Sequence, residues 1–528
     1  MVTLAFQPDA ERYYAERHWR RGDLWSEFAV HAAAAPDKIA LRVGADTITY
    51  GELERAAVTL SARLAVEGVG PADVVLLLGR HSPEAAVALL ACLHSGAVAA
   101  PLPPMFGAQQ LSALASQSGA RALIAFGGDA VVANCESLAG SIPLVLGMRA
   151  GEAGSLAAAS VAETERQPRD ADELALLLHS SGTTSAPKGI MHSSNTLRYA
   201  TEQILARWEL TPADVHLVVC EFGFVGSLVF GYLAILLSGA TGVVLPRWDA
   251  DEALRLIEDH RCTYVLYMPT HGADILRAGR ESTRDGSSLR VLVAPGLTRE
   301  RRIAMHEVFG RAPIADYGLS EVPGHVTHRL SESWEKVITT EGIPFPGTDV
   351  QILDERDQPV RAGQTGAIVV NGPSRFLGFY GNDELTRASF TAAGGYRTGD
   401  VGHLDADGQL VYGGRSKDII RRGGVTLVPG EIEAVLLRHP AIREVAIVPL
   451  PDERLGERAC AAVIVEPGAE APSLTELQEF LGAEGVSKYS WPESIERFDE
   501  FPRTPSLKVV KREIVKAILE RAAASMAT

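Results

Sequence analysis

The chain has 528 residues, of which 66 are acidic and 50 basic, and its formal net charge is −16. Apolar residues make up 46% and charged residues 22%, values that are ordinary for a globular protein and exclude a disordered or collagen-like chain. The acidic balance argues against a nucleic-acid partner, because a DNA-binding protein would carry a basic stripe. At about 150 residues per domain, the length fits three or four structural units, or one large composite domain with a small one.

The five cysteines are scattered, odd in number and free of CxxC spacing; they are Cys92, Cys135, Cys220, Cys262 and Cys460. We interpret them as reduced core thiols of a cytoplasmic protein, rather than as a disulfide framework or a zinc site. The first 21 residues contain no apolar run followed by a cleavage site, so we expect no signal peptide.

Strand-like and helical patterns alternate over the first 170 residues. The pattern predicts strands at 38–43, 47–50, 74–79 and 97–103, and a capped helix at 82–96. Such alternation favours parallel sheets covered on both faces. Residues 150–172 are polar and lack periodicity, which indicates a connecting loop.

Residues 222–246 contain no charge and are long enough to span a bilayer. Gly239, Ala240, Thr241 and Gly242 divide them into a helix-length and a strand-length piece. A membrane-spanning helix would not need that break, so we expect a buried helix followed by a buried parallel strand, and no membrane span.

The pattern of predicted secondary structure changes near residue 347. Residues 347–372 give two alternating strands around a polar turn, which indicates a meander or a small barrel. From 415 onward follow a Gly-rich turn with a basic cluster, a helix at 431–440, strands at 445–452 and 459–468, and a helix at 473–485. These elements predict a compact α+β unit with a boundary near 415.

The strongest local motif is LLLHSSGTTSAPKGIMHS at 176–193, in which an apolar strand runs into a loop of small residues. Glycines permit unusual backbone geometry, and hydroxyls with one lysine can cradle a polyphosphate. The candidate residues are Ser180, Ser181, Gly182, Thr183, Thr184 and Lys188. A Walker loop is excluded because Lys188 follows proline, and no SDN or KTG motif accompanies the S-x-x-K spacing of a penicillin-binding enzyme.

The stretch SSGTTSAPKG resembles the phosphate loop of the ATP-dependent adenylate-forming superfamily of acyl-CoA synthetases, firefly-type luciferases and peptide-synthetase adenylation domains. Four further stretches resemble the motifs of that family, in family order: DYGLSE (316–321), YRTGD (396–400), GRSKDIIRRGG (414–424) and PRTPSLK (502–508). MHSSNTL and LPRWDADEAL most resemble the branch with cyclohexanecarboxylate- and dihydroxybenzoate-activating enzymes.

The resemblance implies an α/β fold: a large N-terminal domain of stacked α/β sheet subdomains plus a small β-barrel, and a small mobile α+β C-terminal domain. We therefore predict an AMP-binding, or adenylation, domain over residues 1–415 and a mobile lid domain over residues 416–528.

The resemblance also implies roles in nucleotide binding for the DYGLSE motif. Tyr317 would present an aromatic face to adenine, Asp316 would meet the adenine amino group, and Gly318 is counted with them as a nucleotide-binding residue. Ser320 would touch the α-phosphate. Glu321 would hold Mg²⁺, a hard ion that prefers oxygen ligands. We count Ser320 and Glu321 as catalytic.

The remaining nucleotide contacts come from three other motifs. The loop at 180–189 would bind the ATP triphosphate, with Lys188 as a catalytic cation. Asp400 would accept the ribose hydroxyls, with Arg415 nearby. Lys508 would be the catalytic lysine that reaches the substrate carboxylate and the α-phosphate.

After adenylation the small domain would rotate about Lys417 and present another face for thioester formation, with Gly424 lining the pantetheine tunnel. Two chemically distinct half-reactions benefit from two domain poses. Basic residues cluster at 415–422 and 503–521, which favours a locally basic lid on an acidic body.

Three positions depart from the family pattern. Leu507 and Ser185 each stand where glycine is usual. The family's His or aromatic gate to the acyl pocket falls at Gly223, and we expect the missing side chain to leave space there for a bulkier acyl group. Glu221 is interpreted as structural or solvent-linked, with recognition of a substrate amine as the alternative.

The other predicted acyl-pocket walls are mostly apolar: Phe224, Val225, Gly226, Tyr267, Met268, Ala294, Pro295, Gly296, Leu319 and Pro323. This favours an aromatic, alicyclic or medium-chain monoacid. His325 and His328 lack a third ligand at sensible spacing and are interpreted as pocket or surface histidines rather than metal ligands.

The sequence thus predicts an AMP-forming acid–thiol ligase that uses ATP, Mg²⁺ and CoA, as a monomer or homodimer. One alternative is a stand-alone adenylation enzyme that loads an acyl or amino acid onto the phosphopantetheine of an acyl carrier protein. A remote alternative is a nucleotide-binding protein without turnover.

Overall fold

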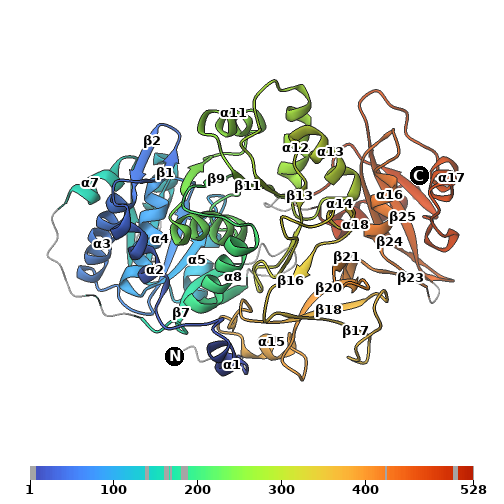
Figure 1. The fold of residues 1–528 in the computed structure, drawn as a ribbon. Coiled ribbons are helices and arrows are strands. Elements are labelled where there is room, and N and C mark those ends of the chain that lie inside the picture. The colour runs from blue at the N-terminus through green and yellow to red at the C-terminus, as the bar shows by residue number, and fades with distance from the viewer. Residues whose placement is uncertain are drawn as a thin grey trace. The chain divides into compact units, whose positions relative to one another are not determined.

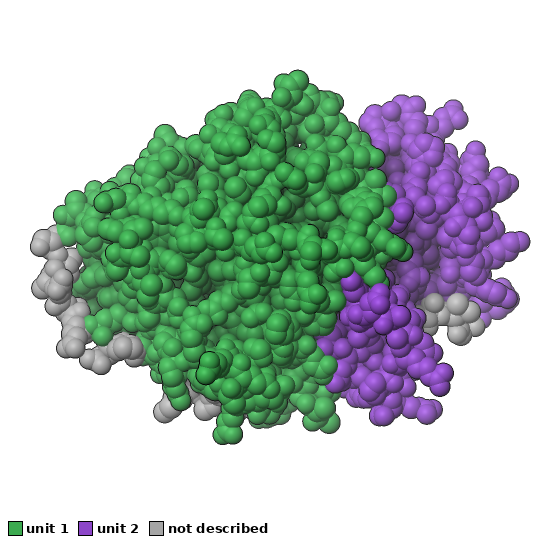
Figure 2. Space-filling view, viewed as in Figure 1, with its two compact units in different colours: residues 1–297, 301–349, 370–396 green, residues 298–300, 350–369, 397–528 purple. Residues whose placement is uncertain are grey.

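The fold is described from a computed structural model that defines residues 7–136, 142–159, 166, 169–179, 188–422, 425–503 and 509–526. The chain divides into two compact units (Figure 2). Unit 1 comprises residues 1–297, 301–349 and 370–396, and unit 2 comprises residues 298–300, 350–369 and 397–528. The predicted α/β class is confirmed, while the boundary at 415 as the edge of a moving lid stays a prediction.

Unit 1 contains two seven-stranded sheets (Figure 1). Sheet A runs in the order β13 (Pro313–Ile314), β12 (Val291–Val293), β11 (Tyr264–Leu266), β9 (Val215–Val218), β10 (Thr241–Val244), β1 (Ile39–Val43) and β2 (Asp46–Thr49). Its strands pair in parallel except for β2, which joins β1 as a hairpin. The strands predicted at 38–43 and 47–50 are this hairpin.

Sheet B runs in the order β19 (Gly378–Phe379), β8 (Gly189–Ser193), β7 (Leu174–His179), β4 (Val98–Leu102), β3 (Val74–Gly79), β5 (Ala122–Phe126) and β6 (Leu144–Gly147). The strands from β7 to β6 are parallel. β8 and β19 form an antiparallel edge beyond β7. This edge carries the end of the predicted phosphate-loop hairpin.

Helix α4 (Pro83–Ser95) lies between the two sheets, where it contacts β3, β4 and β5 of sheet B and β1 and β2 of sheet A. Every residue from 83 to 93 is buried. A helix covered all round has no polar face, which explains the continuous run of alanine and leucine. Ser82 caps its first turn by accepting from Ala85 N, and Gly96 ends it at φ 76°. The predicted capped helix is confirmed.

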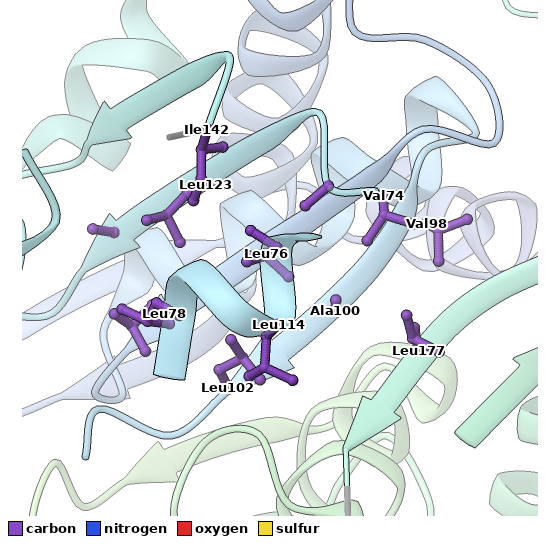
Figure 3. Packing of buried hydrophobic residues seen from close by; sticks show 14 of the residues in the cluster. Val74, Leu76, Leu78, Val98, Ala100, Leu102, Leu114, Leu123, Ile142 and Leu177 are labelled. Carbon is purple, nitrogen blue, oxygen red and sulfur yellow. The ribbon is translucent and has the colours of Figure 1, made fainter. Parts of the chain in front are cut away.

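One core of unit 1 lies on a single face of sheet B (Figure 3). Val74, Leu76 and Leu78 alternate along β3 and pack with Leu111 and Leu114 of α5 (Ala108–Ser118). The period of two follows from the strand geometry, because successive side chains point to opposite faces.

The uncharged segment folds as expected. It forms α9 (Val225–Ser227), the π-helix η2 (Leu228–Leu233) and α10 (Ala234–Ser238), and then strand β10. Gly239 ends the helix at φ 72°, a left-handed conformation that favours glycine. Among the described residues, no helix is long and apolar enough to cross a membrane.

The other helices of unit 1 are α1 (Ala10–Ala15), α2 (Leu24–Ala34), α3 (Tyr50–Val66), α6 (Asp129–Glu136), α7 (Glu152–Ala158), α8 (Ser194–Arg207), α11 (Ala250–His260), α12 (Pro269–Glu281), α14 (Trp334–Thr339) and α15 (Asp383–Ala388). Helix α13 (Arg299–Phe309) begins in unit 2 and continues in unit 1. The loop prediction for 150–172 was wrong over α7. Its first backbone N–H groups are satisfied from outside, because the buried Glu84 carboxylate accepts from Gly151 N (3.1 Å) and Ala153 N (3.3 Å).

A short antiparallel sheet of unit 1 consists of β14 (Asp316–Tyr317), β15 (Val326–Thr327) and β16 (Ile343–Pro344). Unit 2 contains an open four-stranded sheet, β17 (Asp349–Leu353), β18 (Gly366–Asn371), β20 (Tyr396–Leu404) and β21 (Leu410–Arg415). The first residue of β17, the last two of β18 and the first of β20 belong to unit 1. The two strands predicted at 347–372 are confirmed. The predicted barrel is not: the described strands form no closed barrel there.

The C-terminal part of unit 2 is an α+β fold, as predicted. Its sheet contains β23 (Val425–Leu427), β22 (Ile420–Arg422), β25 (Gly456–Val465), β24 (Ile442–Asp452) and β26 (Ser494–Arg497). Alternate residues of β25 face opposite cores: one beneath α16 (Pro429–Leu436) and α17 (Leu474–Ala483), the other beneath α18 (Lys511–Met526). The five cysteines of the chain are free and buried, as expected.

Candidate functional site

The predicted acyl-pocket residues follow the carboxyl ends of four neighbouring strands of sheet A. They lie in the segments after β9 (221–226), β11 (267–268), β12 (294–296) and β13 (316–323). Ligands of open parallel sheets bind at this edge, because each strand delivers a loop there. Backbone hydrogen bonds join these loops: Tyr267 N donates to Val293 O and Ala294 N to Ile314 O, each at 2.8 Å.

These wall residues differ in exposure. Those that are partly exposed are Phe224, Val225, Gly226, Met268, Pro295 and Leu319; Gly296 is exposed, and Tyr267, Ala294 and Pro323 are buried. The Tyr267 ring packs edge-on against Trp248, with 5.9 Å between ring centroids. Tyr267 is therefore part of the core beneath the edge.

Gly223 does not leave the space that the sequence suggested. Its φ is +99°, and a Cβ placed on it would lie 2.6 Å from Pro103 N and 2.7 Å from Leu102 C at the end of β4. The close approach of two backbones, rather than an open gate, is what requires glycine here. The expectation of free volume at this position was wrong.

Residues 318–324 form a tight loop after β14. Leu319 and Val322 exchange backbone hydrogen bonds in both directions, at 3.1 and 3.2 Å. A Cβ on Gly318 would lie 2.8 Å from Gly324 N, so the loop closes without room for a side chain at that glycine. Between Leu319 and Val322 the loop presents the partly exposed Ser320 and Glu321.

Asp316 and Tyr317 precede this loop and are both buried, each 7% exposed. Asp316 Oδ1 has no hydrogen-bond partner among the described residues, and burial, with the nearby Glu341 carboxylate, raises the pKa of Asp316 well above its usual range. The Tyr317 ring packs against His325, with 5.0 Å between centroids. Asp316 is thus a buried carboxyl group that favours its protonated form and whose Oδ1 is unsatisfied among the described residues.

The phosphate-loop hairpin is described at its two ends only. β7 and β8 pair from Leu174↔Ser193 to His179↔Gly189, and Lys188 Nζ lies 5.3 Å from the centroid of the Phe379 ring. The predicted phosphate ligands of the loop itself lie outside the described residues: Ser180, Ser181, Gly182, Thr183 and Thr184, together with Ser185.

Unit 2 carries the predicted ribose site. Asp400 and Arg415 face each other across β20 and β21, and Arg415 Nε lies 3.1 Å from Asp400 Oδ1. The Asp400 side chain is 2% exposed, and a buried carboxylate needs such a partner. Lys417 is exposed, on a short 3₁₀ turn after β21. Gly424, Leu507 and Lys508 lie outside the described residues.

Several basic side chains of the two clusters predicted at 415–422 and 503–521 form ion pairs with carboxylates of unit 2. Arg422 pairs with Glu493, Arg503 with Glu444, and Lys511 with Glu433 (2.6 Å). Their positive charge is largely neutralised within the unit, which weakens the expectation of a basic lid.

Glu321 is the one candidate metal ligand that the sequence offered. Its backbone oxygen accepts from Phe376 N (2.8 Å), which fixes the residue while its side chain stays partly exposed. Within the described part of the chain, no group of three or more His, Cys, Asp or Glu side chains could hold a metal ion. A single carboxylate fits Mg²⁺, which takes one or two carboxylates and completes its shell with phosphate oxygens and water.

His325 and His328 are buried core residues, so a surface position is excluded. His328 Nδ1 accepts from Ala315 N (3.2 Å) while Nε2 lies 3.0 Å from Thr340 Oγ1. Burial lowers the pKa of His325 to about 4 and that of His328 to about 3, so both are neutral and structural.

Glu221 lies 4.0 Å from Arg80, and its other oxygen, Oε2, has no hydrogen-bond partner in the described part of the molecule. Burial raises the pKa of Glu221. The contact with Arg80 favours the structural interpretation.

The chain matches the AMP-binding enzyme family over residues 28–380 and the C-terminal domain of AMP-binding enzymes over residues 431–508. It is 30% identical to the medium-chain fatty-acid–CoA ligase of Escherichia coli (strain K12), over 98% of this chain and 95% of that protein. It is also 30% identical to the 2,3-dihydroxybenzoate-AMP ligase of Bacillus subtilis (strain 168), over 97% of this chain and 96% of that protein.

Its fold is similar to the crystal structure of ATP-bound MatB from Rhodopseudomonas palustris, with a TM-score of 0.85 and 24% identity over 94% of this chain and 98% of that chain. The match to the family covers more than half of the sequence and includes the DYGLSE loop and the β7–β8 hairpin. The chain therefore belongs to the adenylate-forming AMP-binding enzyme family.

Proposed function

We propose that this protein activates a carboxylic acid with ATP and transfers the acyl group to CoA. In the first half-reaction a carboxylate oxygen bonds to the α-phosphorus of ATP, the α–β phosphoanhydride bond breaks, and pyrophosphate leaves. In the second, the thiol sulfur of CoA bonds to the acyl carbon, the bond to AMP breaks, and the thiol proton is released.

One observation carries the proposal: unit 1 holds the end of the phosphate-loop hairpin beside the loop of Ser320 and Glu321. Phe376 N donates to Glu321 O, and the next residue donates from Leu377 N to Met191 O of β8, both at 2.8 Å. A cation at Lys188, a hydroxyl and a carboxylate are thereby tied to one edge of sheet B. Such preorganised groups stabilise charge that shifts among phosphate oxygens.

The remaining roles follow from the chemistry of the residues. Glu321 would hold Mg²⁺, which when bound offsets the charge of the phosphates. Asp400, paired with Arg415, would accept hydrogen bonds from the two ribose hydroxyls. Lys508 would bring a positive charge to the carboxylate and the α-phosphate in the first half-reaction, and Lys417 and Gly424 would serve the second pose of residues 416–528.

An apolar monoacid fits the mostly apolar and glycine-rich walls after β9, β11 and β12. The fatty-acid–CoA ligase relative supports CoA as acceptor and a medium chain as substrate. The dihydroxybenzoate-AMP ligase relative favours a second candidate, in which an aromatic acid is adenylated and loaded onto the phosphopantetheine of a carrier protein.

An acid panel tests both candidates. Each acid is assayed for ATP-dependent pyrophosphate release, alone, with CoA and with a holo-carrier protein. CoA-dependent turnover with a medium-chain, alicyclic or aromatic acid supports the ligase. Turnover with the carrier protein but not with CoA supports the second candidate, and ATP binding without acid-dependent release contradicts both.

A further inference from the structure

His192 is a buried histidine to which the sequence analysis gave no role. It lies near the end of β8, four residues after Lys188, and its side chain is 0% exposed. Its backbone pairs with Leu176 of β7, so its position is fixed by the hairpin that carries the predicted phosphate loop.

Both ring nitrogens of His192 are engaged. Nε2 lies 2.8 Å from Ser320 O, and Nδ1 lies 3.1 Å from Thr196 Oγ1 in the first turn of α8. A carbonyl oxygen only accepts, so Nε2 must carry the proton; in the neutral ring Nδ1 then accepts from the Thr196 hydroxyl. The contacts therefore define one tautomer.

The contact to Ser320 is one of two on consecutive carbonyls. Ser320 O accepts from the His192 side chain, and Glu321 O accepts from Phe376 N (2.8 Å). His192 lies in β8, and Phe376 lies just before β19, the neighbouring edge strand of sheet B. The segment that contains Phe376 is bound to β8, because Leu377 N donates to Met191 O and Tyr380 N donates to Gly189 O. The backbone at Ser320 and Glu321 is thus held on one side by β8 and on the other by the segment entering β19.

We propose that His192 is a positioning residue for adenylation: its Nε2–H fixes the Ser320 carbonyl and so keeps the Ser320 hydroxyl and the Glu321 carboxylate in register with the phosphate-loop hairpin. The inference rests on the proposed function. His192 would touch neither ATP nor the acid, and it would act through the backbone of the 318–324 loop.

The environment of His192 suits a permanent donor. Burial lowers the pKa of His192 to about 4, so the ring is neutral at neutral pH and keeps its single Nε2–H. In a charged ring Nδ1 would also carry a proton and would donate to Thr196 Oγ1 instead of accepting from it. Nε2 carries its proton in both forms of the ring, so the hydrogen bond to Ser320 O does not depend on the protonation of Nδ1.

Two variants separate positioning from packing. His192→Gln offers an amide N–H near the place of Nε2, whereas His192→Phe fills the ring volume without a donor. We expect His192→Phe to lower kcat for acid-dependent ATP–pyrophosphate exchange by about 10–100-fold, the scale of a small misplacement of reacting groups. His192→Gln should recover at least about a third of the wild-type rate, because it keeps the donor.

The control is His216→Phe, which replaces another 0%-exposed histidine whose two ring nitrogens meet no hydrogen-bond partner among the described residues. Its exchange activity should stay within about two-fold of wild type, since no positioning contact is removed. Equal loss in all three variants, or equal rates of His192→Phe and wild type, would overturn the proposal.

A coupled variant tests the route through Ser320. If His192 acts by orienting that residue, Ser320→Ala should cost less in the His192→Phe background than in wild type, whereas additive losses would contradict the route. If the variants do not fold, ¹⁵N-NMR of the wild-type imidazoles decides: a neutral Nε2–H tautomer at pH 7 supports the contact, and an Nδ1–H tautomer refutes it. Wild type without acid-dependent exchange refutes the proposed function instead.

Discussion

Gly223 offers a test of how the two seven-stranded sheets meet. At this position φ is +99°, and an added Cβ would lie 2.6 Å from Pro103 N. Gly22 is a matched control, because its φ is +101° but nothing lies within 4 Å of its Cβ position. Alanine at the two sites therefore imposes the same backbone penalty and differs in the clash.

The two penalties can be estimated separately. A left-handed backbone costs an L-residue about 1–2 kcal/mol, which is the whole effect expected for Gly22→Ala. Overpacking against a rigid neighbour adds about 1–3 kcal/mol, and Gly223→Ala would press on the backbone of β4 rather than on a flexible side chain. We expect Gly223→Ala to destabilise the protein by about 2–5 kcal/mol, and Gly223→His by more.

Urea unfolding followed by tryptophan fluorescence measures this difference. Trp491 is the one tryptophan of six outside unit 1, so the signal reports mainly on the unit that contains both glycines. A lower urea midpoint for Gly223→Ala than for Gly22→Ala confirms the clash. Equal urea midpoints, or a Gly223→His variant as stable as wild type, would refute the reasoning. Either result would support the earlier expectation that the missing side chain at Gly223 leaves free space.

Three other changes have defined outcomes. Burial lowers the pKa of His216 to about 4, below the 6.5 of an unfolded histidine, so its contribution to stability is complete above pH 6.5 and is lost as the pH falls toward 4; in His216→Phe, urea midpoints from pH 7 to 4.5 should fall less steeply than in wild type. Asp400→Asn removes the buried charge that faces Arg415 and should raise the KM for ATP by about 10-fold, the scale of a hydrogen bond to a charged group, whereas an unchanged KM in initial-rate assays would contradict the ribose assignment. Lys508→Ala should slow adenylation by about 10²–10³-fold and largely spare thioester formation from a supplied acyl-adenylate, and equal loss of both half-reactions in single-turnover assays would count against its role.

Local signals predicted the elements that are covered on all sides. The helix at 82–96 was predictable because α4 is buried between the two sheets, which makes its sequence apolar, and because Ser82 and Gly96 mark its two ends. The division at Gly239 was equally readable, since a left-handed glycine must end α10 before β10 begins. Helix α7 was missed because its stabilisation is non-local: the Glu84 carboxylate that caps it comes from α4.

The candidate site shows the same limit. The residues of DYGLSE and YRTGD were recognisable by pattern, and the parallel order of sheet A explains why the pocket loops share an edge. Gly223 was misread because its neighbour, Pro103, is distant in sequence. His192 was passed over because its partner is a backbone oxygen 128 residues away, and sequence alone does not reveal such a contact.

Acid-dependent ATP–pyrophosphate exchange tests the central claim most directly, because it requires the acid, ATP and a reversible adenylate at once. With ³²P-pyrophosphate, Mg²⁺ and a panel of apolar monoacids, the account predicts label in ATP only when an acceptable acid is present, and loss of that label in Lys508→Ala. Exchange without any acid, or ATP binding with no exchange across the panel, would contradict it.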